Sequence, residues 1–148
     1  MSYLYHKRIV VQKQCMIIII DVGLLVLIWM VQLLIYPSFL YFEAKDLLRW
    51  HPLYTRHMTV IVLPLMVAEL LTHMWLLYTH FSYIQLLLCI MVVSIWAVTF
   101  LVSVPLHGKI SKEENLKDTC KSLVNTNWIR TVLWSLVVLV QLLIGISD

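Results

Sequence analysis

Glu69 and His73 are ionisable side chains in the middle of a long apolar run, so they are the first candidates for chemistry. The run from Met58 to Tyr78 is long enough to cross a bilayer. A charged side chain at bilayer depth costs about 2.5–3.5 kcal/mol on insertion scales, and it therefore needs a partner. Glu69 marks either a functional site or a buried structural pair.

Further polar side chains gather at one end of the predicted spans. His51 and His57 precede the run that holds Glu69, and His107 follows the next apolar run. Asn127 and Arg130 lie at the start of the last run. In an up-down helical bundle these ends meet, so we expect the side chains to line a polar cavity there.

Three kinds of site are compatible with these residue types. A non-haem metal ion takes imidazole and carboxylate ligands. The candidate metal ligands are His51, His57, Glu69 and His107. A haem with two axial imidazoles would use His57 and His107.

Without a metal, His51 or His57 would act as the general base. Arg130 and Asn127 would then hold an anionic oxygen of the substrate. The cofactor stays open between a non-haem metal ion, haem and none.

The buried polar residues also have structural interpretations. Glu69 would be neutralised by a hydrogen bond to Arg130, Gln32 or a serine. Asp21 lies in the first apolar run at a depth that matches His73. An Asp21–His73 pair would neutralise two side chains that are costly when they are buried alone.

The composition predicts a single all-α integral membrane domain over residues 1–148. Of the 148 residues 61% are hydrophobic and 13% are charged, whereas a soluble domain carries about 25% charged residues. The three cysteines have no spacing typical of a metal site. Four runs are long enough to span a bilayer. They are Met16–Tyr36, Met58–Tyr78, Tyr83–Val104 and Trp128–Ile146. We expect these runs to form an up-down four-helix bundle.

Lysine and arginine residues predict the orientation of this bundle. They are concentrated in the long connections before the second and the fourth spans, whereas the turn at residues 79–82 has none. The positive-inside rule places these two connections in the cytoplasm and both termini outside. The net charge of +3 follows from this topology and requires no nucleic-acid partner.

The connections contain signals for local structure. Phe42–Trp50 mixes apolar and charged residues, which predicts a short helix on the membrane surface. Pro52 then favours a new helix start. Pro105 predicts that the third helix ends there, with a turn at residues 106–108. The fourth helix is expected to begin near Lys112 and to run through its span from a cytoplasmic extension.

Four segments carry a family resemblance. They are QLLIYP at Gln32–Pro37, HPLYTRHMTVIVLPLMVAE at His51–Glu69, VPLH at Val104–His107 and NWIRTVLW at Asn127–Trp134. This pattern resembles small bacterial four-helix integral membrane proteins of uncharacterised function that are distantly similar to the anthrone-oxygenase-like group. The resemblance implies a four-helix fold in the bacterial inner membrane and oxygenation of polyphenolic substrates. The positions it singles out are His51, His57, Glu69, His107, Asn127 and Arg130.

These observations favour three functions. The first is a membrane oxidoreductase or oxygenase that acts on a lipophilic substrate, quinone-like or polyaromatic. The second is an accessory subunit of a homo-oligomer or a larger membrane complex, in which the polar groups fix helices or bind lipids. The third is a proton or small-solute conduit that uses Asp21, His73 and Glu69 as relay groups.

Overall fold

The structure is a computed structural model that describes the backbone of residues 2–147 and the side chains of residues 16–144. Every regular element of the described chain is helical. In chain order the elements are α1 (Ser2–Met30), η1 (Val31–Ile35), α2 (Tyr36–Ser38), α3 (Ala44–Thr79), α4 (Tyr83–Val98), η2 (Thr99–Ser103), α5 (Val104–Ser111) and α6 (Leu116–Ser147). The two η elements are π-helices, in which each backbone hydrogen bond spans five residues.

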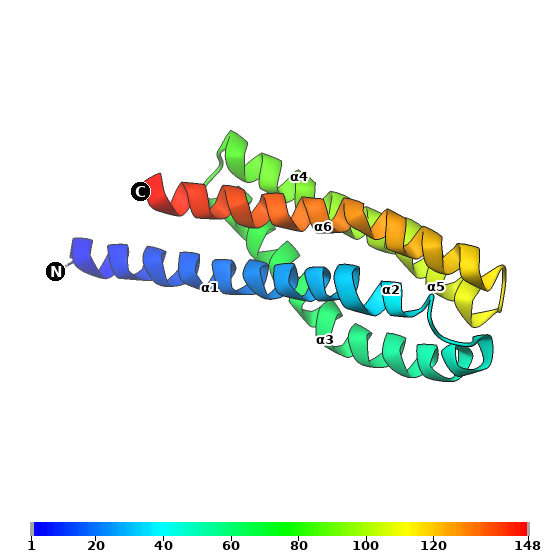
Figure 1. The fold of residues 1–148 in the computed structure, drawn as a ribbon. Coiled ribbons are helices and arrows are strands. Elements are labelled where there is room, and N and C mark those ends of the chain that lie inside the picture. The colour runs from blue at the N-terminus through cyan, green and yellow to red at the C-terminus, as the bar shows by residue number, and fades with distance from the viewer. Residues whose placement is uncertain (1, 148) are drawn as a thin grey trace.

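Four helical stretches of the described chain are long and apolar enough to cross a membrane. They are Met16–Ser38, Ala44–Thr79, Tyr83–Ser111 and Leu116–Ile144. Successive stretches run in opposite directions, and α1 packs along α6 (Figure 1). The backbone near both termini lies at one end, and the connections at residues 39–43 and 112–115 lie at the other end, which we call the loop end. The predicted number of spanning helices is confirmed.

The prediction of a separate short helix at Phe42–Trp50 is wrong. Helix α3 begins at Ala44 and runs without a break to Thr79. Leu47 is fully buried and His51 is 1% exposed, so the first turns pack onto the bundle. Pro52 lies inside this helix and does not begin a new one. With no glycine or proline between Ala44 and His51, nothing stops the helix before that point.

The turn predicted at residues 106–108 is also absent, because the third spanning stretch continues as α5 to Ser111. Helix α6 begins at Leu116 and not near Lys112. Residues 112–115 form the connection, in which Glu113 and Asn115 adopt positive φ angles of 61° and 43°. These conformations are not helical, so they interrupt the helix between α5 and α6. Both connections at the loop end are short.

Each π-helix lies just before a proline, and its wider turn allows the helical backbone to continue past that proline. The N–H of Tyr36, the residue before Pro37, bonds to the carbonyl of Val31. The N–H of Val104 bonds to the carbonyl of Thr99 in the same way, just before Pro105. Proline lacks an N–H and collides with the carbonyl one turn back, so a locally wider turn accommodates it. Both helices thereby continue to the loop end.

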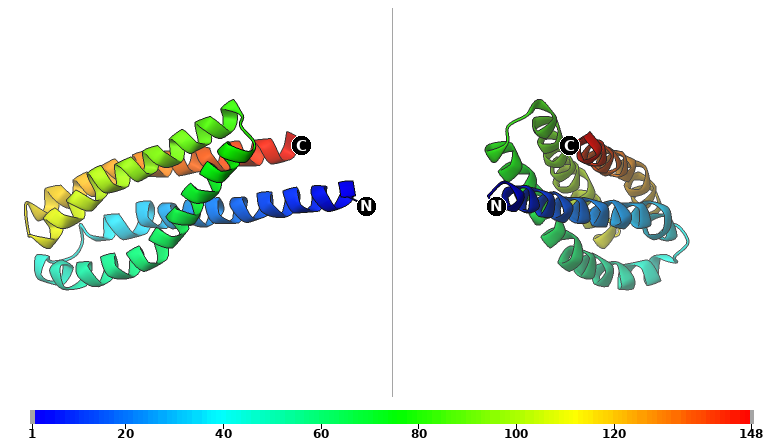
Figure 2. Two further views of the ribbon diagram at one scale, coloured as in Figure 1. Left: turned by 180° about the vertical axis from the view of Figure 1, so that it is seen from behind. Right: turned by 90° about the vertical axis from the view of Figure 1, so that its left-hand side faces the viewer.

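Helix α3 contains two further prolines, Pro52 and Pro64. The helix curves across the bundle and changes its neighbours along its length (Figure 2). It contacts α1, α4 and α5. A proline inside a helix removes a backbone hydrogen bond and is the commonest cause of such a bend.

The predicted Asp21–His73 pair is confirmed. Both side chains are fully buried, and His73 Nε2 lies 3.3 and 3.4 Å from the two carboxylate oxygens of Asp21. Gln85 Nε2 lies 3.2 Å from His73 Nδ1. The cluster therefore connects α1, α3 and α4 in the apolar interior, where each of these groups would be costly alone.

We expect the Asp21–His73 pair to stabilise the bundle through a measurable coupling. Asp21→Ala and His73→Ala should each lower the free energy of unfolding by roughly 1–3 kcal/mol, because each change leaves a buried polar partner. The double variant should lose less than the sum. Unfolding of the purified protein in mixed detergent micelles measures the four values, with the lipid-facing Val22→Ala as control. Additive losses would contradict a direct pair.

Candidate functional site

Two histidines form the centre of a hydrogen-bonded chain at the loop end. His51 Nε2 lies 2.9 Å from His107 Nδ1. His107 Nε2 lies 3.0 Å from the hydroxyl of Tyr36. On the other side, Ser111 Oγ lies 3.3 Å from His51 Nδ1. The four side chains come from α2, α3 and α5, so the chain exists only when these helices are packed together.

The protons of this hydrogen-bonded chain of side chains can be arranged in two ways. In one, Tyr36 donates to His107, His107 donates to His51, and His51 donates to Ser111, whose hydroxyl donates to the carbonyl of His107 at 3.1 Å. In the other, the three side-chain hydrogen bonds are reversed: Ser111 donates to His51, His51 donates to His107, and His107 donates to Tyr36, whose hydroxyl becomes free to donate elsewhere. A chain with two such arrangements can pass a proton from exposed Ser111 to buried Tyr36.

Aromatic packing fixes the rings of this hydrogen-bonded chain, which we call the relay. Phe39 places its ring centroid 5.9 Å from His51 and 5.5 Å from Tyr54, edge to face in both cases. The ring of Tyr36 also meets the ring of His107 edge to face, at 5.5 Å. These contacts restrict ring rotation, so the imidazole nitrogens stay aligned for hydrogen bonding.

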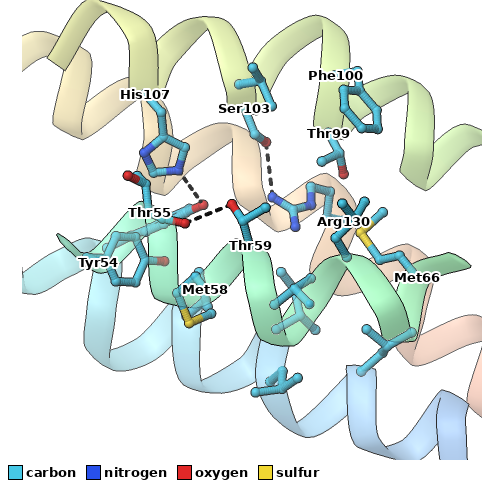
Figure 3. A pocket seen from close by; sticks show the side chains of 18 of the residues that line it. Tyr54, Thr55, Met58, Thr59, Met66, Thr99, Phe100, Ser103, His107 and Arg130 are labelled. Carbon is cyan, nitrogen blue, oxygen red and sulfur yellow. Dashed lines mark hydrogen bonds between the residues drawn. The ribbon is translucent and has the colours of Figure 1, made fainter. Parts of the chain in front are cut away.

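Arg130 is a buried cation that no carboxylate neutralises in the part of the chain with described side chains. It is 6% exposed and donates from Nη1 to the hydroxyl of Ser103 at 3.1 Å (Figure 3). Its Nε has no hydrogen-bond partner among the described residues. The ion pairs between described side chains are Asp21–His73 and Asp118–Lys121. A guanidinium buried in this way favours an anionic oxygen beside it.

Trp134 separates Arg130 from the nearest candidate counter-ion. Its indole Nε1 donates to Glu69 Oε1 at 2.8 Å. The face of the same ring lies 5.4 Å from Arg130 Cζ, within cation–π range. The expected partners of Glu69 were Arg130, Gln32 or a serine, and that prediction is wrong. Trp134 follows Arg130 by one turn on the same face of α6, so its large ring occupies the space between them.

Asn127 belongs to a structural network between α6 and η1. It donates to Gln32 Oε1 at 2.9 Å, and Thr131 donates to the same oxygen at 3.4 Å. Gln32 in turn donates to the carbonyl of Val124 at 3.3 Å. The network attaches η1 to α6, and Asn127 is not among the residues that line the cavity described next.

A cavity of about 310 Å³ lies beside Arg130. Residues of α3 lie on one side of it and residues of η2 and α5 on the other, with Arg130 reaching in from α6 (Figure 3). Its polar lining consists of Tyr36, Tyr54, Thr55, Thr59, Thr99, Ser103, His107 and Arg130. The rest of the lining is apolar and includes Leu24, Ile28, Met58 and Met66. A small number of polar groups in an apolar cavity is typical of small-molecule sites.

The structure brings together only part of the predicted site. His51 and His107 are in contact, whereas His57 is exposed and Glu69 is bonded to Trp134. At about 100° per residue, the side chain of His57 lies about 240° around the axis of α3 from that of His51, so the two side chains do not share a face of the helix. Among the described side chains, no group of three or more His, Cys, Asp or Glu could hold a metal ion. The predicted four-residue metal set is therefore not assembled among the described side chains, whereas the His57–His107 haem pair stays a prediction.

Sequence reasoning missed Ser103, Ser111 and the separating role of Trp134. Ser111 follows His107 by one helical turn, so a helix that continued past Pro105 would have predicted its position. Ser103 and Trp134 gave no comparable signal. Their roles depend on how α6 packs against η2 and α3.

Comparisons with known proteins identify no relative. No family model matches the chain, and neither a curated protein nor a solved structure matches it. The resemblance to the anthrone-oxygenase-like group therefore stays a prediction.

We expect Trp134→Phe to destabilise the protein by about 1–3 kcal/mol, because it leaves the buried carboxyl of Glu69 without its donor. Trp128→Phe, a change at an exposed tryptophan of the same helix, is the matched control. Thermal unfolding in detergent compares the two variants. The added change Glu69→Leu should recover part of the loss. Equal stability of both tryptophan variants would show that the Trp134–Glu69 hydrogen bond contributes nothing.

Proposed function

We propose that the cavity binds a lipophilic small molecule through an acidic or phenolic oxygen placed against Arg130. The observation that carries this proposal is the buried guanidinium of Arg130, which faces a largely apolar cavity with no carboxylate among the described side chains to neutralise it. A bound phenolate, enolate or carboxylate would supply the missing negative charge. The apolar lining would hold the rest of the molecule.

The relay gives this site an acid–base function. Tyr36 and His107 both line the cavity, and both connect to His51 and Ser111. A proton released by the bound molecule would pass to Tyr36 or His107 and leave towards the loop end. Arg130 would stabilise the oxyanion that remains, which is the usual way in which a buried cation favours deprotonation.

This chemistry fits a membrane oxidoreductase or oxygenase that acts on a quinone-like or polyaromatic substrate. A deprotonated phenol or hydroquinone is far easier to oxidise than its neutral form. The oxidation itself needs an electron acceptor, for which molecular oxygen or a redox partner is suitable. The residues of this chain would supply binding, charge stabilisation and proton transfer.

We also propose the orientation that the charges predict. At the loop end, Lys45 and Arg49 lie in the first two turns of α3, Lys109 lies in the last turn of α5, and Lys112 lies in the connection. With this end in the cytoplasm, the relay would exchange protons with cytoplasmic water. A bacterial inner membrane is the location that agrees with the resemblance described above.

Binding of a lipophilic nitrophenol tests the role of Arg130. The wild type should bind the probe as its phenolate, which is visible as a red-shifted absorption band. Arg130→Gln should weaken binding about 100-fold, because the phenolate then lacks its counter-ion. Arg56→Gln, at an exposed arginine of α3, should bind like the wild type. Equal affinity of all three proteins would refute the proposal.

The same probe tests the proton relay. After a rapid pH jump, the absorbance of the bound probe reports how fast its proton exchanges with water. His51→Phe should slow this exchange roughly 100-fold by interrupting the chain, with affinity little changed. His57→Phe is the control, because His57 is exposed and outside the chain. An unchanged rate in His51→Phe would exclude this path.

The accessory-subunit alternative makes a different prediction for the same variants. If the polar groups only fix helices, Arg130→Gln should lower stability or assembly into a larger complex, and the wild type should not bind the probe. Thermal unfolding and size-exclusion chromatography of both proteins measure these effects.

A further inference from the structure

The cavity beside Arg130 reaches the outer surface of the bundle between two spanning helices. Several residues that line it are also exposed: Leu63 on α3 is 40% exposed, Phe100 on η2 is 47% exposed and Val104 on α5 is 50% exposed. Thr59 on α3 lines the cavity and is exposed as well. These four residues form the rim of an opening, which we call the lateral opening.

The lateral opening lies between helical stretches that are apolar and long enough to cross a membrane, so in a bilayer it would face hydrocarbon. All four rim residues lie within helical stretches that are long and apolar enough to cross a membrane. Thr59 and Val104 lie towards the loop end of these stretches, and Leu63 and Phe100 lie about one turn deeper. The opening therefore extends by about one helical turn from its loop-end side towards the middle of these stretches.

Helix packing explains why an opening exists here. Helix α3 contacts both α4 and α5, whereas the cavity lining from the third spanning stretch comes from η2 and the first turn of α5. The side chains on the two sides of the cavity face each other across it (Figure 3). The π-helix η2 has a wider turn than an α-helix at this level. On the other side of the cavity, Pro64 lies next to the rim residue Leu63 on α3.

The size of the cavity limits what it can enclose. A volume of about 310 Å³ is at the lower end for ligand sites, which suffices for a ring system or a polar head. A long aliphatic tail does not fit in the same space. Such a tail can pass through the lateral opening, because the rim is mostly apolar and continues into the lipid phase.

We infer that the natural ligand is a membrane-resident amphiphile with an acidic or phenolic head and an aliphatic tail. Its head enters sideways from the bilayer and meets Arg130, while its tail stays in the hydrocarbon between α3 and η2. The charge of Arg130 selects the head, and the apolar rim selects the tail. This inference rests on the proposed function, since it assumes that the cavity binds an acidic oxygen.

Two nitrophenol probes, one without and one with a long alkyl chain, test this inference in phosphatidylcholine nanodiscs. Thr59→Trp and Val104→Trp place a large ring in the lateral opening. Each should weaken binding of the tailed probe about tenfold, because the introduced ring leaves no space for the tail while the head is in the cavity. Both residues also line the cavity, so binding of the tailless probe should weaken as well, but by a smaller factor, and the ratio of the two affinities reports the tail.

Matched controls are available on both sides of the opening. Val60 is 70% exposed and Leu101 is 76% exposed, and neither lines the cavity. Val60→Trp and Leu101→Trp should therefore bind both probes like the wild type. If Thr59→Trp and Val104→Trp also bind the tailed probe like the wild type, the lateral opening is not its binding path.

A photoreactive group at the tail end of the probe gives a second measurement on the wild type alone. Labelling should fall on lipid-facing residues of α3 and of the helix formed by η2 and α5. Labelling of the connections at residues 39–43 or 112–115 would overturn the inference, because the tail would then leave through the loop end. If the wild type binds the tailless probe but not the tailed one, this inference alone fails. If it binds neither, the proposed function fails with it.

Discussion

The guanidinium of Arg130 is held inside a bundle of four helices that are long and apolar enough to cross a membrane, and it has no carboxylate partner among the described side chains. A buried positive charge is tolerated at such depth only with dipoles, aromatic faces or a bound anion around it. Ser103 supplies a hydroxyl dipole and Trp134 supplies a ring face. Glu69, which could neutralise the charge, is bonded to the indole N–H at the edge of that ring. The arrangement keeps both groups buried and leaves Arg130 available to the cavity.

Two prolines define the geometry around this charge. Pro37 and Pro105 each follow a π-helix, and in both cases the helix continues to the loop end. Because the third stretch continues past Pro105, His107 lines the cavity within hydrogen-bond distance of Tyr36, which precedes Pro37. The wider turns also carry Gln32 and Ser103, which attach the first and third spanning stretches to α6. Local strain from proline is thus accommodated at the level where the polar groups meet.

The bundle contains two buried polar levels with different characters. Asp21, His73 and Gln85 satisfy one another and connect three helices, which is typical of polar groups that fix helix packing in a membrane. At the loop end, Ser111, His51, His107 and Tyr36 form a chain that leads from an exposed hydroxyl to the cavity. The first level fits a structural role, because its members are all buried and paired. The second fits proton exchange, because its two ends are in different environments.

The sequence by itself determined the four apolar helices, the Asp21–His73 pair and the meeting of His51, His107 and Arg130 at one end. Hydrophobic length sets the helices, and two polar groups at equal depth in an apolar medium must find each other. Helical phase in the sequence would also have excluded His57 from the site. The partner of Glu69, the continuation of two helices past Pro37 and Pro105, and the lateral opening were decided only by the tertiary structure. Each of these depends on the angle and register at which α3, η2 and α6 pack, and side-chain spacing along one helix does not encode how neighbouring helices cross.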